Sequence, residues 1–207
     1  MTAVAVIAKE CLPGRVKTRL QPEFSAAEAA ALAAASLADT LRVAGALPAS
    51  RRILYFDGAV PPADARGWEV ISQCGGNLDD RIGALFDAVD EPLLLLGMDT
   101  PHLDPDMLSA VFAADQEVDA WFGPATDGGF WALGMRRPDG DLVRGVPMSL
   151  DTTGFHQLQR LTAAGLRVRL LPPLTDIDTP ADVPEAARRA PALARALRTL
   201  RPAGVTA

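Results

Sequence analysis

The 207-residue sequence contains few of the residues that build disulfide frameworks and zinc sites. It has two cysteines, Cys11 and Cys74, and two histidines, His102 and His156. Two cysteines are too few for a disulfide framework, and these four residues do not form a Cys/His zinc-binding pattern. The sequence also lacks the Gly-x-Ser-x-Gly and His-Glu-x-x-His motifs. It therefore offers no candidate serine hydrolase or zinc protease site.

Positive charge is scarce as well. The 20 basic residues are outnumbered by 26 acidic residues, which gives a net charge of −6. Such a chain has no overall positive field that would collect nucleic acid or anionic lipid. It has no apolar run of about 18 residues, and Lys9 interrupts the first apolar segment before it reaches signal-peptide length. We therefore expect a cytoplasmic protein with neither a nucleic-acid nor a membrane partner.

Hydrophobic residues make up 49% of the chain, and a length of 207 residues suits one domain better than two. Apolar runs of strand character occur at residues 4–8, 52–56, 68–72, 92–96, 120–123, 130–134 and 167–171. Helical patterns or capping signals occur at residues 25–47, 78–89, 104 onward, 153–164 and 180–200. Because strands that are apolar throughout alternate with helices, we expect a single α/β domain over residues 1–207, a three-layer sandwich around a mostly parallel sheet. Pro184 and Pro191 are expected to interrupt the last helix, and the final residues to fray.

Ligands of such sheets bind beyond the carboxyl ends of the strands, which draws attention to the segment after the first strand. Both lysines of the chain lie there, and Pro13 followed by Gly14 predicts a turn. Four cations close together favour a phosphate-binding loop. Its candidate residues are Lys9, Gly14, Arg15, Lys17, Thr18 and Arg19. Val16 stands where a Walker A motif has glycine, so the loop is of another kind. The alternative is a solvated loop whose cations pair with surface carboxylates.

Carboxylates follow the predicted central strand and recur near the end of the chain. Asp99 comes directly after residues 92–96, at the edge of the sheet where ligands gather. Asp176 and Asp178 lie two positions apart in a predicted extended segment, so their side chains point the same way. Carboxylates are the ligands that Mg²⁺ or Mn²⁺ prefers, and a nucleotide phosphate would complete the coordination. The alternative is that Asp99 caps the turn before the helix at Asp104, and that Asp178 or Thr179 caps the helix that Pro180 begins.

Two glycine-containing segments are further candidates. Residues 73–81 let the backbone close on a flat ligand such as a base, and residues 123–131 could line an acceptor site. The nucleotide-binding candidates are Gln73, Gly75, Gly76 and Arg81. The acceptor-binding candidates are Thr126, Asp127, Gly128 and Gly129. A simple strand-to-helix turn explains the first segment equally well, and a hairpin turn explains the second.

Taken in order, these motifs resemble those of the family called domain of unknown function 2064. The matching segments are residues 8–20, 39–41, 73–81, 97–101, 123–125, 127–129 and 176–179. The family comprises bacterial transferases often labelled glycosyltransferases and is similar to 2-phospholactate guanylyltransferases. The resemblance implies the GT-A, or nucleotide-diphospho-sugar transferase, fold. It also implies an acceptor contact at Ser149, although residues 147–150 depart from the Trp-Ser-Thr that the family usually has there.

Three functions are compatible with these residues. The first is nucleotidyl transfer from a nucleoside triphosphate to a small phosphorylated or acidic acceptor, with release of pyrophosphate. In this hypothesis the cations of the first loop hold the triphosphate, Asp99 and Asp178 hold Mg²⁺, and Lys17, Arg19 and Asp99 are the catalytic residues. The second is glycosyl transfer from a nucleotide sugar. Gly97, two residues before Asp99, removes the Asp-x-Asp motif that such enzymes usually carry at this strand. The third is a non-catalytic nucleotide-binding domain.

Overall fold

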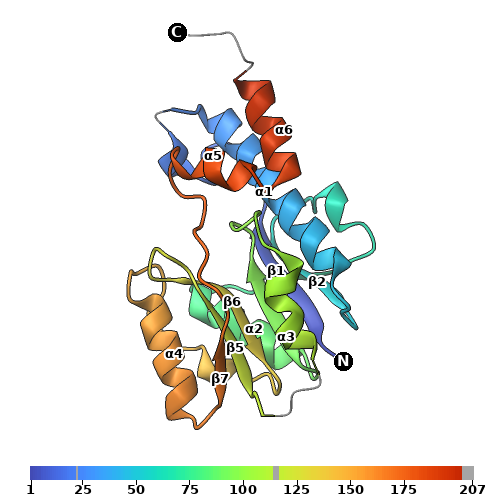
Figure 1. Ribbon diagram of the computed structural model, residues 1–207, viewed down its shortest axis with the longest axis vertical. Helices are drawn as coiled ribbons and strands as arrows, with labels where there is room; N and C mark the ends of the chain where they lie inside the picture. Colours follow the sequence, from blue (N-terminus) through green and yellow to red (C-terminus); the bar gives the residue numbers. More distant parts are fainter. Residues whose placement is uncertain (22, 114–116, 202–207) are drawn as a thin grey trace.

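The protein is built around one central sheet in the computed structural model, which describes residues 1–21, 23–113 and 117–201 (Figure 1). The sheet has seven strands in the order β3-β2-β1-β4-β6-β5-β7. The strands are β1 (Ala3–Lys9), β2 (Arg52–Asp57), β3 (Glu69–Ser72), β4 (Leu93–Gly97), β5 (Ala120–Pro124), β6 (Phe130–Met135) and β7 (Val168–Leu170). β6 runs antiparallel to both of its neighbours, and the other pairings are parallel. The prediction of a mostly parallel sheet is therefore confirmed. The predicted fraying of the final residues falls outside the described part of the chain.

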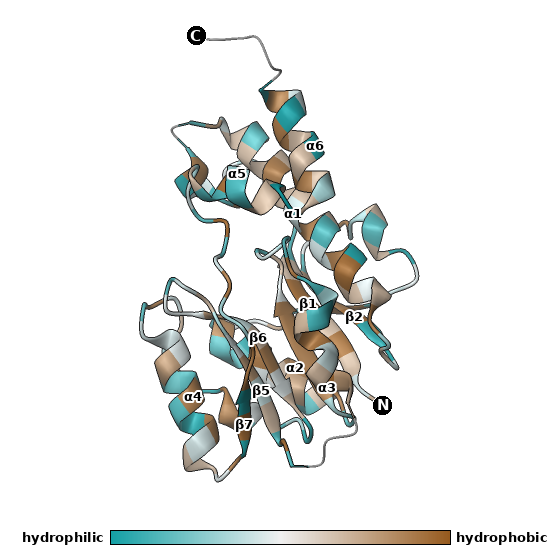
Figure 2. Ribbon diagram, in the orientation of Figure 1, coloured by the Kyte–Doolittle hydropathy of each residue, from teal (hydrophilic) through white to brown (hydrophobic). Residues whose placement is uncertain are grey.

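Helices cover both faces of the sheet, as a three-layer sandwich requires. They are α1 (Ala26–Ala46), α2 (Leu78–Ala88), α3 (Ser109–Phe112), α4 (Thr153–Ala163), α5 (Asp182–Ala187) and α6 (Pro191–Leu200). Alternate residues of β1 pack to opposite sides: Val4 and Val6 join the core beneath α1 and α3, whereas Ala3 and Ala5 join the core beneath α2 and α4. Figure 2 shows hydrophobic residues concentrated in β1 and β2, because both faces of these strands are covered.

α1 begins where the sequence predicts. The Ser25 side chain accepts a hydrogen bond from the Glu28 backbone N–H, and the Glu28 carboxylate accepts one from the Ser25 N–H, which completes a capping box. Among the described residues, α1 is long and apolar enough to cross a membrane. Most of this helix is buried inside the protein, however. Burial of this kind is expected of a core helix.

The C-terminal helices pack on α1 on the side away from the sheet strands (Figure 1). Asp39 in α1 is 1% exposed, and its carboxylate accepts hydrogen bonds from the backbone N–H groups of Ala192 and Leu193 at the start of α6. Leu20 and Phe24 lie in the same apolar cluster. The C-terminal helices therefore hold the end of the first loop in place.

Two predictions about helices need correction. The segment after Asp104 is not one regular helix, because a 3-10 turn over Pro105–Leu108 precedes α3. Pro184 does not interrupt a helix, because it lies in the first turn of α5. Backbone N–H groups in the first turn form no hydrogen bond within the helix, so proline, which lacks this group, is tolerated there. The break falls between α5 and α6, and the interruption predicted at Pro191 is found there, since Pro191 is the first residue of α6.

Candidate functional site

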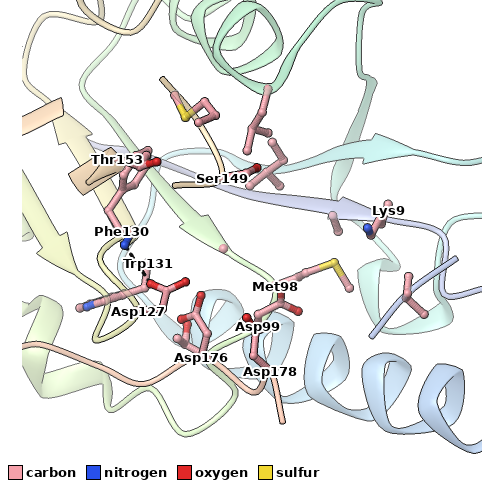
Figure 3. Close-up of a pocket in the computed structure, with 18 of the residues that line it drawn as sticks. Lys9, Met98, Asp99, Asp127, Phe130, Trp131, Ser149, Thr153, Asp176 and Asp178 are labelled. Carbon is pink, nitrogen blue, oxygen red and sulfur yellow. Dashed lines mark hydrogen bonds between the residues drawn. The ribbon is translucent and has the colours of Figure 1, made fainter. Parts of the chain in front are cut away.

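A cavity of about 780 Å³ opens at the carboxyl ends of β1 and β4. Ile7, Ala8 and Lys9 from β1 line it, together with Gly97 from β4 and the residues that follow that strand. In Figure 3, Asp99, Asp127, Asp176 and Asp178 form a group on one side of the cavity, and Lys9 lies apart from them. The cavity lies where open α/β sheets bind ligands.

Lys17 is at the centre of the charged part of the cavity. Its Nζ atom lies 3.1 Å from Asp99 Oδ2 and 3.1 Å from Asp178 Oδ1, and its side chain is only 8% exposed. Burial alone would lower the pKa of Lys17, but the two carboxylates outweigh it and raise the pKa. Lys17 is therefore held as a cation between the ends of two segments remote in sequence.

Arg19 adds a second cation to this group. Its Nη1 atom lies 3.1 Å from Asp178 Oδ2, but the side chain is 77% exposed. Because the two cations share Asp178, its carboxylate orients one inside the cavity and one at its mouth. The prediction that the first loop, Asp99 and Asp178 meet at one place agrees with these distances.

The backbone is unusual at two positions in the cavity wall. Lys17 has φ of 48° and Ser149 has φ of 61°, and among the described residues these are the non-glycine residues with positive φ. The left-handed backbone conformation is unfavourable for residues with a Cβ atom. Residues held in such a strained conformation are often found at functional sites. Both residues line the cavity. The Lys17 side chain lies inside the protein and is 8% exposed.

Asp176 lies deeper than Asp178. Burial, with the nearby carboxylates of Asp99 and Asp127, raises the pKa of Asp176 to about 7. Its Oδ1 atom is buried and has no hydrogen-bond partner. A carboxylate of this kind is costly when it is charged, unless a cation or a ligand reaches it.

The opposite end of the cavity is a hydrogen-bonded network. Gln73 donates from Nε2 to the carbonyl oxygens of Ala8 (2.9 Å) and Tyr55 (3.0 Å). Arg81 Nη1 donates to Asp57 Oδ2 (2.9 Å) and to Gln73 Oε1 (3.3 Å). These bonds tie the ends of β1 and β2 to α2, and they present a carboxylate and a guanidinium to the cavity. Sequence reasoning did not select Asp57, although its place at the end of a strand was a usable signal.

The segments predicted to bind an acceptor lie together. The Gly154 N–H at the start of α4 donates to the Gly128 carbonyl (2.8 Å), and Gly129 N–H donates to Asp127 Oδ1 (2.9 Å). Gly128 has φ of 91°, and a Cβ atom there would lie 1.9 Å from the Asp151 carbonyl oxygen. The turn after β5 therefore packs directly on the segment that holds Ser149 and Asp151.

Most, but not all, of the predicted site residues line this cavity. Those that do are Lys9, Lys17, Thr18, Arg19, Gln73, Arg81, Asp99, Asp127, Gly129, Ser149, Asp176 and Asp178. Those that do not are Gly14, Arg15, Gly75, Gly76, Thr126 and Gly128. Gly14 and Gly76 have positive φ, so they shape the chain on either side of the cavity. Arg15 is exposed and does not line the cavity, whereas Lys17 and Arg19 do. Sequence reasoning missed Asp57, Met148, Leu150, Asp151 and Thr153.

The carboxylates of Asp99 and Asp178 suit a metal ion that binds together with a nucleotide. They suit a permanently bound metal ion less well. Among residues 1–21, 23–113 and 117–201, no group of three or more His, Cys, Asp or Glu side chains is arranged to hold a metal ion. Asp99 and Asp178 nevertheless bind one cationic atom together, and each is about one-third exposed. Mg²⁺ is commonly held by one or two carboxylates and completed by substrate phosphates and water. The donor set is compatible with that arrangement.

The fold is that of nucleotide-diphospho-sugar transferases. A putative nucleotide-diphospho-sugar transferase from Desulfovibrio desulfuricans G20 is similar, with a TM-score of 0.80 and 23% identity, over 96% of this chain and 94% of that one. The 2-C-methyl-D-erythritol 4-phosphate cytidylyltransferase from Thermus thermophilus gives 0.55 and 19%, over 93% and 99%. Rv0371C of Mycobacterium tuberculosis H37Rv, in a complex with manganese, gives 0.53 and 20%, over 89% and 96%. These likenesses concern the fold.

Family membership follows from the sequence itself. Residues 28–150 match the model of the family described as "Uncharacterized protein conserved in bacteria (DUF2064)". The match spans more than half of the chain, so the protein belongs to this family. No curated protein matches the sequence.

Proposed function

We propose that this protein is a divalent-metal-dependent, nucleotide-utilising transferase that moves a nucleotidyl group from a nucleoside triphosphate to a small acceptor and releases pyrophosphate. The observation that carries the proposal is the position of Lys17, a nearly buried cation held by Asp99 and Asp178 at the ligand edge of the sheet. The proposal includes a cytoplasmic location, since nucleoside triphosphates are made and used there. The sequence predicts a phosphorylated or acidic acceptor. Whether such an anion can bind depends on the charge of the side of the cavity where the acceptor would lie.

Attack on the α-phosphorus of a nucleoside triphosphate moves negative charge onto the leaving pyrophosphate. A transferase of this kind needs cations fixed where that charge develops, and it needs no covalent nucleophile of its own. Lys17 and Arg19 supply such cations, and Lys9 lies in the same cavity. The raised pKa of Lys17 keeps it protonated at neutral pH. When the metal is bound it neutralises phosphate charge, and Asp99 and Asp178 are the residues that would hold it.

The donor end would be formed by the network of Gln73, Arg81 and Asp57. Gln73 is fixed by its bonds to Ala8 and Tyr55, and Arg81 by its bonds to Asp57 and Gln73, so these side chains would not need to reorganise when a base enters. The proposal has support from relatives of the same fold: one solved structure is a cytidylyltransferase and another holds manganese. Both are under 25% identical to this chain, so they support it by analogy of fold alone.

Glycosyl transfer from a nucleotide sugar is the second candidate, and a separate observation favours it. The putative nucleotide-diphospho-sugar transferase resembles this chain over nearly its whole length with a TM-score of 0.80. Against it, β4 ends in Gly97, so no Asp-x-Asp motif precedes the cavity at this strand. The third candidate, a nucleotide-binding domain without turnover, would have been favoured by loss of Lys17 or Asp99, and both are in place.

The products distinguish the three functions. Purified protein is incubated with Mg²⁺, a panel of acceptors and each nucleoside triphosphate, and pyrophosphate is measured. A parallel series uses UDP-, GDP- and TDP-sugars, and free nucleoside diphosphate is measured. The proposal expects acceptor-dependent pyrophosphate. Release of nucleoside diphosphate from a sugar donor would contradict nucleotidyl transfer and favour glycosyl transfer. Nucleotide binding without any turnover would favour a non-catalytic nucleotide-binding domain.

A further inference from the structure

The two sides of the cavity differ in charge. Every lysine or arginine that lines it belongs to the first loop, the end of β1 or α2: Lys9, Lys17, Arg19 and Arg81. The facing side is built from residues 127–131 and 148–153 with Asp176, and we call it the acceptor wall. No lysine or arginine occurs in these described segments. In Figure 3, Lys9 lies on one side of the cavity, and Asp127, Phe130 and Thr153 lie on the other.

Two exposed carboxylates of the acceptor wall have no cationic partner among the described residues. Asp127 and Asp151 are exposed, and neither forms an ion pair with a described residue. Asp176 lies behind them: its buried Oδ1 atom has no hydrogen-bond partner among the described residues, and Lys17 is one of the charged groups that act on it. A phosphate or carboxylate brought against Asp127 and Asp151 would meet like charge with no ion-paired cation beside it, and such contacts discriminate strongly against a ligand.

The same wall has an apolar surface. Phe130 and Met148 are half-buried, and Leu150 is 53% exposed at the cavity. Leu78 faces the cavity from the start of α2 and is 41% exposed. Large apolar side chains left exposed in a concave site indicate contact with an apolar part of a ligand. The ring of Phe130 beside carboxylates suits a molecule with C–H faces and hydroxyl edges.

Ser149 adds a polar group to the wall. Its left-handed backbone is held by its neighbours: Thr153 Oγ1 donates to the Pro147 carbonyl (2.9 Å) and accepts from the Leu150 N–H (3.0 Å). The hydroxyl of Thr153 is therefore already used to shape the loop. Ser149 is exposed in the cavity, free to meet a hydroxyl or amine of a ligand.

From these observations we infer that the acceptor of the proposed transfer is a hydroxyl-bearing molecule with an apolar face, neutral or positively charged, and without a phosphate or carboxylate at the end that enters the acceptor wall. The inference rests on the proposed function and changes the acceptor class that the sequence predicts. In the nucleotidyl reaction the acceptor oxygen forms a bond to the α-phosphorus, the bond from that phosphorus to the pyrophosphate oxygen breaks, and the hydroxyl proton leaves to a carboxylate of the wall or to water.

The test separates possible acceptors by charge without knowing their identity. A bacterial small-molecule extract is passed over an anion-exchange resin at pH 7, and the unretained and retained fractions are each added to the protein with Mg²⁺ and every nucleotide donor of the product assay. The inference expects turnover with the unretained fraction. Turnover that follows only the retained, anionic fraction overturns the inference and leaves the proposed function standing. No turnover with either fraction overturns the proposed function, and the inference falls with it.

A charge-reversed variant tests the wall directly. Asp151 is exposed and its side chain makes no hydrogen bond or ion pair with a described residue, so Asp151→Lys should leave folding unchanged, as thermal unfolding can verify. We expect kcat/KM with the unretained fraction to fall by about tenfold or more and turnover with the retained fraction to rise. Asp64→Lys, at an exposed position outside the cavity, is the matched control and should change neither. Equal behaviour of the two variants would show that the wall does not select the charge of the acceptor.

Discussion

Lys17 Nζ lies 3.1 Å from Asp178 Oδ1, although 161 residues separate them in the sequence. The contact joins the loop after the first strand to the segment that leads into the last two helices. Because Lys17 is nearly buried and also contacts Asp99, the three residues form one charged group at the ligand edge of the sheet. In the proposed function, this group is where the triphosphate and the metal ion bind.

Asp178→Asn is predicted to change nucleotide binding in opposite directions with and without metal. Without a divalent ion, the substitution removes a negative charge close to where the triphosphate lies, so binding should strengthen by about twofold or more. With Mg²⁺ present, it removes a metal ligand and the partner of Lys17 and Arg19, so binding should weaken. Calorimetric titration of a nucleoside triphosphate under the two conditions measures both. The same direction of change in both would argue against a metal at Asp178.

Asp176→Asn is predicted to stabilise the ligand-free protein at alkaline pH. The pKa of Asp176 is raised from 3.8 to about 7, so between those values the folded state keeps a proton that the unfolded state has lost. The free energy of unfolding of the wild type should therefore fall as the pH rises from about 4 to about 7. The amide of the variant avoids that loss. The free energy of unfolding of the variant minus that of the wild type should therefore be about 2–4 kcal/mol larger near pH 8 than near pH 4.

The groups that face Asp176 are Asp99, Asp127, Asp178 and Lys17, and none of them changes in this variant. Urea unfolding of both proteins at pH 4, 6 and 8 is the measurement. A stability difference that is independent of pH would mean that Asp176 is ionised normally in the folded protein.

Gly128→Ala is predicted to destabilise the protein severely. The added Cβ atom would lie 1.9 Å from the Asp151 carbonyl oxygen, and φ of 91° is already unfavourable for alanine. We expect a loss of more than about 3 kcal/mol in the free energy of unfolding. Gly165→Ala is the matched comparison, since Gly165 also has positive φ but has open space around it, and it should cost about 1–2 kcal/mol. Equal losses would show that the turn after β5 can move away from α4.

Asp39→Ala is predicted to loosen the C-terminal helices. The Asp39 carboxylate accepts the backbone N–H groups of Ala192 and Leu193, and its loss leaves the start of α6 without a cap. We expect the free energy of unfolding to fall by about 1–3 kcal/mol. Hydrogen exchange in α6 should become faster than in the wild type, while exchange in the sheet changes less. Asp64→Ala, at an exposed position, should change neither. Unaltered exchange in α6 would mean that its packing on α1 alone holds it.

Local signals in the sequence predict local structure well here. The capping box of Ser25 and Glu28 forms as its spacing indicates, and the apolar run at residues 92–96 becomes a strand within one residue of its predicted bounds. Pro184 was misjudged because the effect of a proline depends on where the helix begins, and that boundary is set by packing on α1. The sequence does not carry such boundaries as a local pattern.

Part of the arrangement of the site could be predicted from the sequence, and part could not. The rule that ligands gather at the carboxyl ends of strands brought Lys17, Asp99 and Asp178 together correctly. It could not tell that Arg15 would lie outside the cavity, because the turns of the loop decide which of its side chains enter the cavity. Part of the acceptor wall was missed for a related reason, although Asp127, Gly129 and Ser149 were predicted to lie there. Asp151 and Leu150 follow no strand, and only the packing of the turn after β5 on α4 brings them to the cavity.

The most direct test of the central claim is the binding of a nucleoside triphosphate with Mg²⁺ to Lys17→Ala and Arg15→Ala, measured by titration calorimetry across the four common bases. With the base that the wild type binds best, removal of the buried cation of Lys17 should raise Kd by about 30-fold, which corresponds to about 2 kcal/mol. Arg15 lies outside the cavity, so its variant should bind as the wild type does. Wild-type affinity in the Lys17 variant, or an equal loss in both, would contradict the account.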